Sequence, residues 1–260
     1  MEKIVPMEHI KETFEVINEA SHNELRVKPH SGCNHLKTVN NSAIFAEEIS
    51  EVAANFPIAF LKDPSIGTFK LSALFGLMPE ENLFVNEKGD WSGTYIPVAL
   101  NLDPFGLVLG AQSDEKRITI NVNSPCVSKA EGEKLFENQQ ETPYLASMRK
   151  QLNTIVDASI QTDKLIAELV NRNLLTEFKI SIEGLSEEPQ VIDDLYTINT
   201  DEFSYLSKED VFMFHEMNYW GAIYGIQQSL KQFKKLVQLS NAKTSNSKIK
   251  ITIYIDGENS

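Results

Sequence analysis

Only two cysteines, Cys33 and Cys126, occur among the 260 residues of this chain. Two thiols so far apart in the sequence provide no disulfide framework, whereas small secreted domains usually carry several bridges. We therefore expect both thiols to be reduced, as in a cytoplasmic protein.

Long hydrophobic runs are also missing. No apolar segment approaches the roughly 18 residues that a membrane-spanning helix requires. The first twenty residues carry charges every few positions and lack the apolar core of a classical signal peptide. The sequence predicts a cytoplasmic protein with no membrane span, and export by a route that needs no signal stays open as an alternative.

Positive charge is scarce, with 24 lysines and arginines against 37 aspartates and glutamates, which gives a net charge of −13. Such a chain repels phosphate backbones, so we expect no nucleic-acid partner. The sequence also lacks a glycine-rich phosphate loop and the Gly-x-Ser-x-Gly turn of serine hydrolases. No complete catalytic motif is present, and we expect no cofactor.

What the sequence does contain is a block of turn residues and aromatics between residues 56 and 107. Proline and glycine specify turns through their backbone angles, and aromatic side chains bury large areas. Aromatics on turn-rich strands often line binding grooves. We therefore interpret Trp91, Tyr95 and Phe105 as candidate ligand contacts, with packing in the core as the alternative role.

The periodicity of the apolar residues predicts an α+β fold. Helical spacing indicates an N-terminal helix over residues 43–55, and alternation indicates strands between about 58 and 122 and again at 178–182. Further helices should start after Thr142, Thr162 and Ser207, and Gly221 should separate the last two helices. We expect a central, mostly antiparallel, twisted sheet, with the N-terminal helix and a helical C-terminal half packed on it.

The domain organisation follows from one polar segment near the end of the chain. Residues 1–239 show no flexible linker and should form a single domain. Residues 240–260 should comprise a polar linker over 240–247 and a strand in which isoleucines alternate with polar residues from Ile249 to Ile255. An edge strand of this kind could pair with another chain, so it could mediate association. The oligomeric state itself stays open.

Two small groups of residues could hold a metal ion. His22 and Glu24 have the spacing of a facial-triad iron site, to which His215 would add a second imidazole; His30 and His35 are other candidates. Surface or capping roles are the alternative. Cys33 lies between His30 and His35, so zinc binding or a cysteine nucleophile is conceivable there, against the alternative of a plain loop.

Several short motifs, in order along the chain, resemble the SapC family of bacterial proteins. They include His22-Asn-Glu-Leu-Arg26, Phe56-Pro-Ile-Ala-Phe60, Leu74-Phe-Gly-Leu77, Glu81-Asn-Leu-Phe-Val85, Trp91-Ser-Gly-Thr-Tyr-Ile-Pro97, Pro104-Phe105 and Glu131-Gly-Glu-Lys-Leu-Phe136. The resemblance covers roughly residues 15–240. The family is named for a surface-layer-associated member.

The resemblance implies a pathway rather than a reaction, because members are often encoded beside flavin-dependent tryptophan-halogenase-like proteins and outer-membrane receptors. This chain also departs from the family pattern at two places. It reads Leu100-Asn-Leu-Asp103 where the family usually has arginines, and Asn121-Val-Asn-Ser124 where an acidic residue is usual. If an arginine–carboxylate pair formed a site there, this chain lacks both partners.

We interpret the chain as a non-catalytic binding or accessory protein of a bacterial pathway that modifies a peptide or metabolite. Its partner should be a protein or peptide, and a flavin-dependent halogenase-like enzyme is the one that the resemblance implies. Two alternatives remain: a non-haem iron oxygenase-like enzyme that uses His22, Glu24 and His215, and a surface-layer-associated protein.

Overall fold

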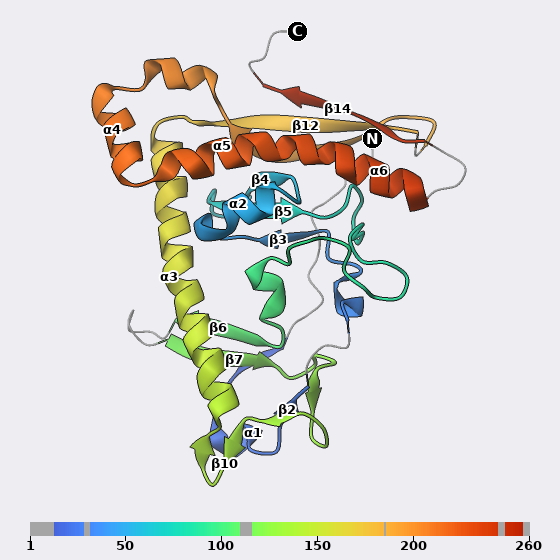
Figure 1. Ribbon diagram of the computed structural model, residues 1–260, viewed down its shortest axis with the longest axis vertical. Helices are drawn as coiled ribbons and strands as arrows, with labels where there is room; N and C mark the ends of the chain where they lie inside the picture. Colours follow the sequence, from blue (N-terminus) through green and yellow to red (C-terminus); the bar gives the residue numbers. More distant parts are fainter. Residues whose placement is uncertain (1–12, 29–31, 110–115, 185, 244–247, 257–260) are drawn as a thin grey trace.

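The computed structural model describes residues 13–28, 32–109, 116–184, 186–243 and 248–256. The molecule is elongated, with a large sheet and most of the helices at one end and small sheets at the other (Figure 1). The helix α3 (Pro143–Asn171) runs along the long axis and connects the two ends. None of the helices in the described ranges is long and apolar enough to cross a membrane.

The main sheet is antiparallel throughout and has the strand order β14-β12-β13-β4-β5-β3. Its strands are β3 (Asn41–Ala43), β4 (Ile58–Lys62), β5 (Phe69–Leu74), β12 (Leu175–Glu183), β13 (Gln190–Ile198) and β14 (Lys250–Ile255). This sheet and the helices of the C-terminal half confirm the predicted α+β class.

Smaller sheets form the other end of the molecule. They contain β1 (Phe14–Val16) with β7 (Lys116–Asn121) and β6 (Phe105–Leu109), then β8 (Val127–Ser128) with β2 (Arg26–Val27) and β9 (Glu133–Lys134), and a pair of β10 (Phe136–Glu137) and β11 (Gln140–Glu141). The remaining helices and turns are α1 (Glu19–His22), η1 (Asn34–Leu36), η2 (Ala46–Glu48), α2 (Ile49–Ala53), η3 (Val98–Asn101), η4 (Asp201–Tyr205), α4 (Lys208–Glu216), α5 (Tyr219–Ser229), η5 (Leu230–Gln232) and α6 (Phe233–Lys243).

Two hydrophobic cores correspond to the two ends. In the larger core, the alternating residues Phe178, Ile180 and Ile182 of β12 are fully buried, as their period of two predicts. The smaller core lies between the small sheets and the first half of α3. The two halves of α3 each bury apolar residues, Leu145 toward the smaller core and Leu169 toward the larger one. The long helix therefore holds the two ends together.

The prediction of one central sheet from about 58 to 122 is wrong in part. Only β4 and β5 of that region enter the main sheet, while β6 and β7 belong to a small sheet. The C-terminal half supplies β12 and β14, which the strands predicted at 178–182 and 249–255 anticipate, and also β13, which was not predicted. The alternation of apolar and polar residues that would predict β13 is interrupted at Asp194. Asp194 has a left-handed φ of 59°, and the register with β12 shifts there.

Helix boundaries also differ from the predictions in places. Thr142 caps α3 and Ser207 caps α4 as expected. Thr162 starts no new helix, because nothing in the preceding turn of α3 breaks the hydrogen-bond ladder; its hydroxyl donates to the Ala158 carbonyl at 2.7 Å. Gly221 lies inside α5, and the break falls at Asn218, whose φ is 57°.

The C-terminal segment is integrated into the fold. Helix α6 continues through Lys243, so it includes the first residues of the predicted linker, and residues 244–247 lie outside the described ranges. Strand β14 then pairs with β12 and forms one edge of the main sheet, which confirms the predicted edge strand. Its isoleucines pack against the larger core.

Candidate functional site

Trp91 packs against an aromatic cluster at the edge of the larger core. Its ring stacks on Phe84, with centroids 5.8 Å apart and planes 27° apart, and also contacts Phe56 and Phe75. The three phenylalanines are fully buried, whereas Trp91 is partly buried. The turn before Trp91 is closed by Gly89, which has a φ of 84°. The turn-rich block thus places the partly buried Trp91 ring against the three buried phenylalanine rings.

A chain of hydrogen bonds fixes the loop that follows Trp91. The Trp91 Nε1–H donates to the Tyr95 carbonyl at 2.8 Å, and the Tyr95 hydroxyl donates to Glu48 Oε2 at 2.8 Å. The N–H of Val98 donates to the same oxygen at 3.0 Å, and the N–H of Phe45 donates to Glu48 Oε1 at 3.0 Å. The pKa of Tyr95 is raised, first by burial and then by this hydrogen bond to Glu48. Ligand contact by Trp91 and Tyr95 stays a prediction.

Glu48 is the residue of this cluster that the sequence pattern missed. The helical spacing over residues 43–55 predicts a helix but gives no sign of a buried glutamate, yet Glu48 is only 6% exposed. The reason is that η2 precedes α2, so the tighter turn rotates Glu48 toward the loop of Tyr95. The signal available in the sequence was weak: one of three closely spaced glutamates that follow an aromatic residue.

Lys235 of α6 lies over the same cluster. Its ammonium is 5.0 Å from the centroid of the Phe84 ring, and burial lowers the pKa of Lys235. Lys243, one further residue of α6, donates to the Asn82 carbonyl at 3.1 Å. These contacts fasten α6 to the turn-rich block and surround the Trp91 cluster with protein groups.

Phe105 lies apart from Trp91 and Tyr95. It is 3% exposed in the smaller core, and its ring centroid is 6.0 Å from that of Tyr144. The structure therefore divides the three predicted ligand contacts between two cores. The sequence could not show this separation, because Pro104 and Phe105 belong to the same turn-rich block as Trp91.

The three predicted iron ligands do not converge. His22 is 2% exposed, and its Nε2 lies 3.2 Å from Glu15 Oε2, whereas the exposed Glu24 accepts from Lys129 Nζ at 3.2 Å. His215 lies on α4, at the opposite end of the molecule from α1 (Figure 1). No group of three His, Cys, Asp or Glu side chains suited to a metal ion occurs in the described part of the chain.

Among the described residues the two cysteines also belong to no such group. No disulfide joins Cys33 to Cys126. The backbone N–H of Cys33 donates to the Gly89 carbonyl at 2.6 Å. Burial raises the pKa of the Cys33 thiol, which disfavours the nucleophilic thiolate. His35 belongs to the short turn η1, and His30 lies outside the described residues.

The two segments that depart from the family pattern lie against each other. The Ser124 hydroxyl donates to Asp103 Oδ2 at 2.8 Å. Ser124 Oγ also accepts from the Cys126 N–H at 3.2 Å. A hydroxyl–carboxylate hydrogen bond therefore joins the two segments, in place of an arginine–carboxylate pair.

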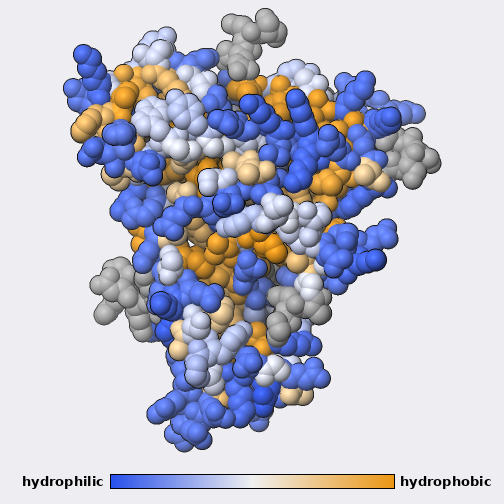
Figure 2. Space-filling view, in the orientation of Figure 1, coloured by the Kyte–Doolittle hydropathy of each residue, from blue (hydrophilic) through white to orange (hydrophobic). Residues whose placement is uncertain are grey.

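Exposed apolar side chains lie beside a hollow at α4. A groove of about 510 Å³ is lined by Leu206, Lys208, Val211, Phe212, His215 and Trp220. Phe212 is 64% exposed, and Tyr205, in the turn before the helix, is 81% exposed. Hydrophobic and weakly polar atoms gather in this upper-left region of the molecule (Figure 2). We call this groove, together with the residues that line it, the α4 groove.

Aromatic packing supports the floor of the α4 groove. Trp220 stacks on Tyr224 with ring centroids 5.9 Å apart, and Phe203 meets both rings edge-on. On the inner side of α4, Phe214 is fully buried and contacts Trp220. One face of this short helix is therefore anchored in the core, and the opposite face carries Phe212 into solvent.

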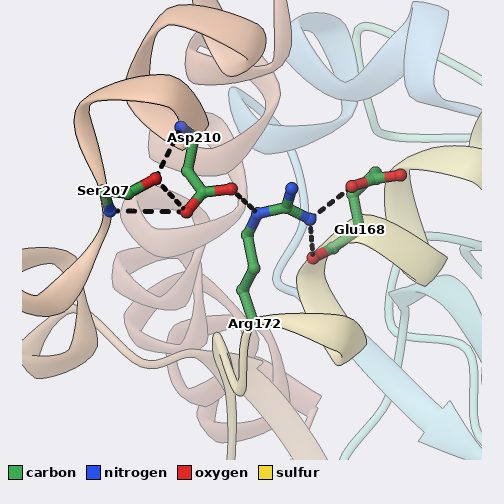
Figure 3. A network of polar contacts seen from close by, with 4 residues as sticks. All are labelled: Glu168, Arg172, Ser207 and Asp210. Atoms are coloured by element: carbon green, nitrogen blue, oxygen red, sulfur yellow. Dashed lines mark hydrogen bonds and ion pairs between the residues drawn. The ribbon is translucent and has the colours of Figure 1, made fainter.

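An ionic network fixes the position of α4 (Figure 3). Arg172, at the end of α3, donates through Nε to Asp210 Oδ1 at 2.7 Å and through another nitrogen to Glu168. Asp210 in turn accepts from the Ser207 hydroxyl at 2.6 Å, which completes the helix cap. The guanidinium carbon of Arg172 also lies 5.3 Å from the Phe214 ring centroid. These contacts make the α4 groove a preformed surface.

A second hollow of about 430 Å³ lies on the other side of the α4–α5 turn. Residues of η2, α2, α3 and α5 line it, including Glu47, Gln161 and Tyr219. Gly221 also lines it, and a Cβ added there would meet no heavy atom within 4 Å. Polar and apolar groups are mixed in this cleft, so it favours no ligand class as clearly as the α4 groove does.

Comparison with known protein families finds a match over most of the chain. A family model described as SapC matches residues 17–236. No curated protein matches the chain. No solved structure matches it either. Since the matched range includes both cores and the motifs of the turn-rich block, the chain belongs to the SapC family.

Proposed function

We propose that the protein is a non-catalytic accessory protein that binds a partner protein or peptide through the α4 groove. The observation that supports this most strongly is the side chain of Phe212, which is 64% exposed beside an apolar groove. Clusters of exposed apolar residues of this kind commonly mark interaction sites. An aromatic residue that lines such a groove is typical of a binding hot spot.

The chemistry of the surface defines the partner that we propose. The groove would take an apolar or aromatic side chain of the partner, and the net charge of −13 favours a partner with a positively charged surface around that anchor. The family resemblance suggests a flavin-dependent halogenase-like enzyme as this partner. We propose that the two proteins act in the cytoplasm, in a pathway that modifies a peptide or metabolite.

Neither alternative has an observation in its favour. An iron oxygenase would need His22, Glu24 and His215 to meet, yet the first two have different partners and the third lies at the other end. A surface-layer role draws only on the family name. The accessory role therefore remains the proposal that the geometry supports best.

Binding measurements with matched variants test the proposal. A halogenase-like flavoprotein encoded beside this chain would be immobilised, and its Kd measured for the wild type, for Phe212→Ser and for Ile66→Ser. Ile66 is 70% exposed in the turn between β4 and β5, outside the groove, so it controls for general surface hydrophobicity. We expect Phe212→Ser to raise Kd about tenfold or more, as hot-spot truncations do, and Ile66→Ser to leave it unchanged. Failure of the wild type to bind, or equal effects of both variants, would overturn the proposal.

A further inference from the structure

The N–H and C=O groups of successive β14 residues point alternately toward β12 and toward the open edge of the sheet. The Asp256 N–H donates to the Glu177 carbonyl of β12 at 2.9 Å, in register with the pairs from Phe178–Ile255 to Glu183–Lys250. Residues of an antiparallel strand alternately face the two neighbouring strands. Lys250, Thr252 and Tyr254 therefore turn their backbone groups toward β12, and three isoleucines turn theirs away from it: Ile251, Ile253 and Ile255.

The side chain of Asn241 marks where this open edge begins. Its Oδ1 accepts from the Ile249 N–H at 2.7 Å, and its Nδ2 donates to the Ile249 carbonyl at 3.2 Å. The amide thus occupies the outward backbone groups of Ile249 as a neighbouring strand would. In the described part of the chain no strand pairs with the outer side of β14. Among the described residues, the open groups are those of Ile251, Ile253 and Ile255, symmetric about Ile253.

We infer that β14 pairs with β14 of a second copy of this chain, antiparallel and with Ile253 opposite its own counterpart. In this register Ile251 faces Ile255 of the second copy, so each of the three isoleucine pairs exchanges two hydrogen bonds and every open group is used. A shift by two residues in one direction would require the groups of Ile249, which Asn241 already occupies. The symmetry of the contact closes it as a two-fold dimer.

The side chains of β14 agree with the same register. Lys250 and Asp256 are both exposed and lie on the same face of the sheet, because both have even positions in the strand. The two-fold pairing places Lys250 of each copy opposite Asp256 of the other, and it places Tyr254, which is 59% exposed, opposite Thr252. A lysine on an edge strand usually discourages pairing, but here it meets an opposite charge. The isoleucines continue the apolar face of the main sheet across the dimer.

The molar mass of the full-length protein over a concentration series tests this inference. Sedimentation velocity should show a species of about twice the 29.3 kDa chain mass that dissociates on dilution. Ile253→Pro removes the outward N–H at the two-fold axis and spares the bonds to β12, so it should give a monomer with an unchanged circular dichroism spectrum. A wild type that stays at the monomer mass at every concentration would overturn the inference.

Charge exchange gives a second test that needs no change in the strand backbone. Lys250→Glu and Asp256→Lys should each raise the dimer dissociation constant about tenfold, because each creates two like-charge pairs across the axis. The double variant should restore the affinity of the wild type. Phe212→Ser should leave dimerisation unchanged, since this inference is independent of the α4 groove. A dimer that none of the β14 variants weakens must use another surface, which would also overturn the inference.

Discussion

Glu48 is a buried charged residue whose loss should destabilise the fold. Its carboxylate accepts from the Tyr95 hydroxyl at 2.8 Å and from the N–H groups of Val98 and Phe45 at 3.0 Å each. Glu48→Ala leaves these three donors without an acceptor in a site where Glu48 is 6% exposed. An unsatisfied buried donor costs about 1–3 kcal/mol. Since the donor residues are partly exposed and water can reach some of them, we expect a total loss of about 3–4 kcal/mol of unfolding free energy.

The loss of unfolding free energy should increase with the number of hydrogen-bond donors that the substitution leaves without an acceptor. Tyr95→Phe removes one donor and keeps the carboxylate satisfied by the two backbone groups, so it should cost only about 1 kcal/mol. The exposed neighbour Glu47→Ala is the matched control and should change stability by less than about 0.5 kcal/mol. Urea unfolding at neutral pH, followed by circular dichroism, measures all three variants. A loss below about 1 kcal/mol for Glu48→Ala would refute the view that Glu48 holds the Tyr95 loop.

Two further predictions concern the supports of the α4–α5 region. The pKa of Asp210 is lowered, first by the hydrogen bond from Ser207, so the stability that it contributes is present above about pH 4 and lost as pH falls through the lower folded value. Asp210→Asn should therefore flatten the decline in thermal midpoint as pH falls below about 4, and an unchanged slope would contradict this. Gly221→Ala should be neutral or stabilising by up to about 1 kcal/mol, because its Cβ would meet open space. Gly225→Ala should lower the thermal midpoint, because its Cβ would lie 2.9 Å from Ile49 Cγ2, and equal midpoints for the two variants would contradict the packing of α5 on α2.

The local pattern of the sequence was sufficient for much of the secondary structure. Thr142 with Pro143 predicted the start of α3, Ser207 predicted the cap of α4, and the alternating isoleucines predicted β14. These signals depend on residues close together in the chain, since a cap or a period of two acts over only a few positions. The short motifs between His22 and Phe136 are local signals too, and they were enough to predict the family, which the match over residues 17–236 confirms.

The assignment of strands to sheets was decided only by tertiary structure. β4 and β6 have similar local patterns, yet they enter different sheets and different cores. A strand shows by its alternation that one face is buried, but not which strand lies beside it. The separation of Phe105 from Trp91 follows from this choice, and no local signal could have predicted it.

The candidate binding surface likewise depended on tertiary contacts. In the sequence, Phe212 and Phe214 are two aromatics in one short helix, with nothing to distinguish the exposed from the buried one. Arg172 selects between them, because its bond to Asp210 and its contact with Phe214 orient α4 with Phe214 inward and Phe212 outward. Arg172 and Asp210 are 38 positions apart in the chain. The sequence by itself determined the helix, and only a contact between distant residues determined which face of that helix is open to a partner.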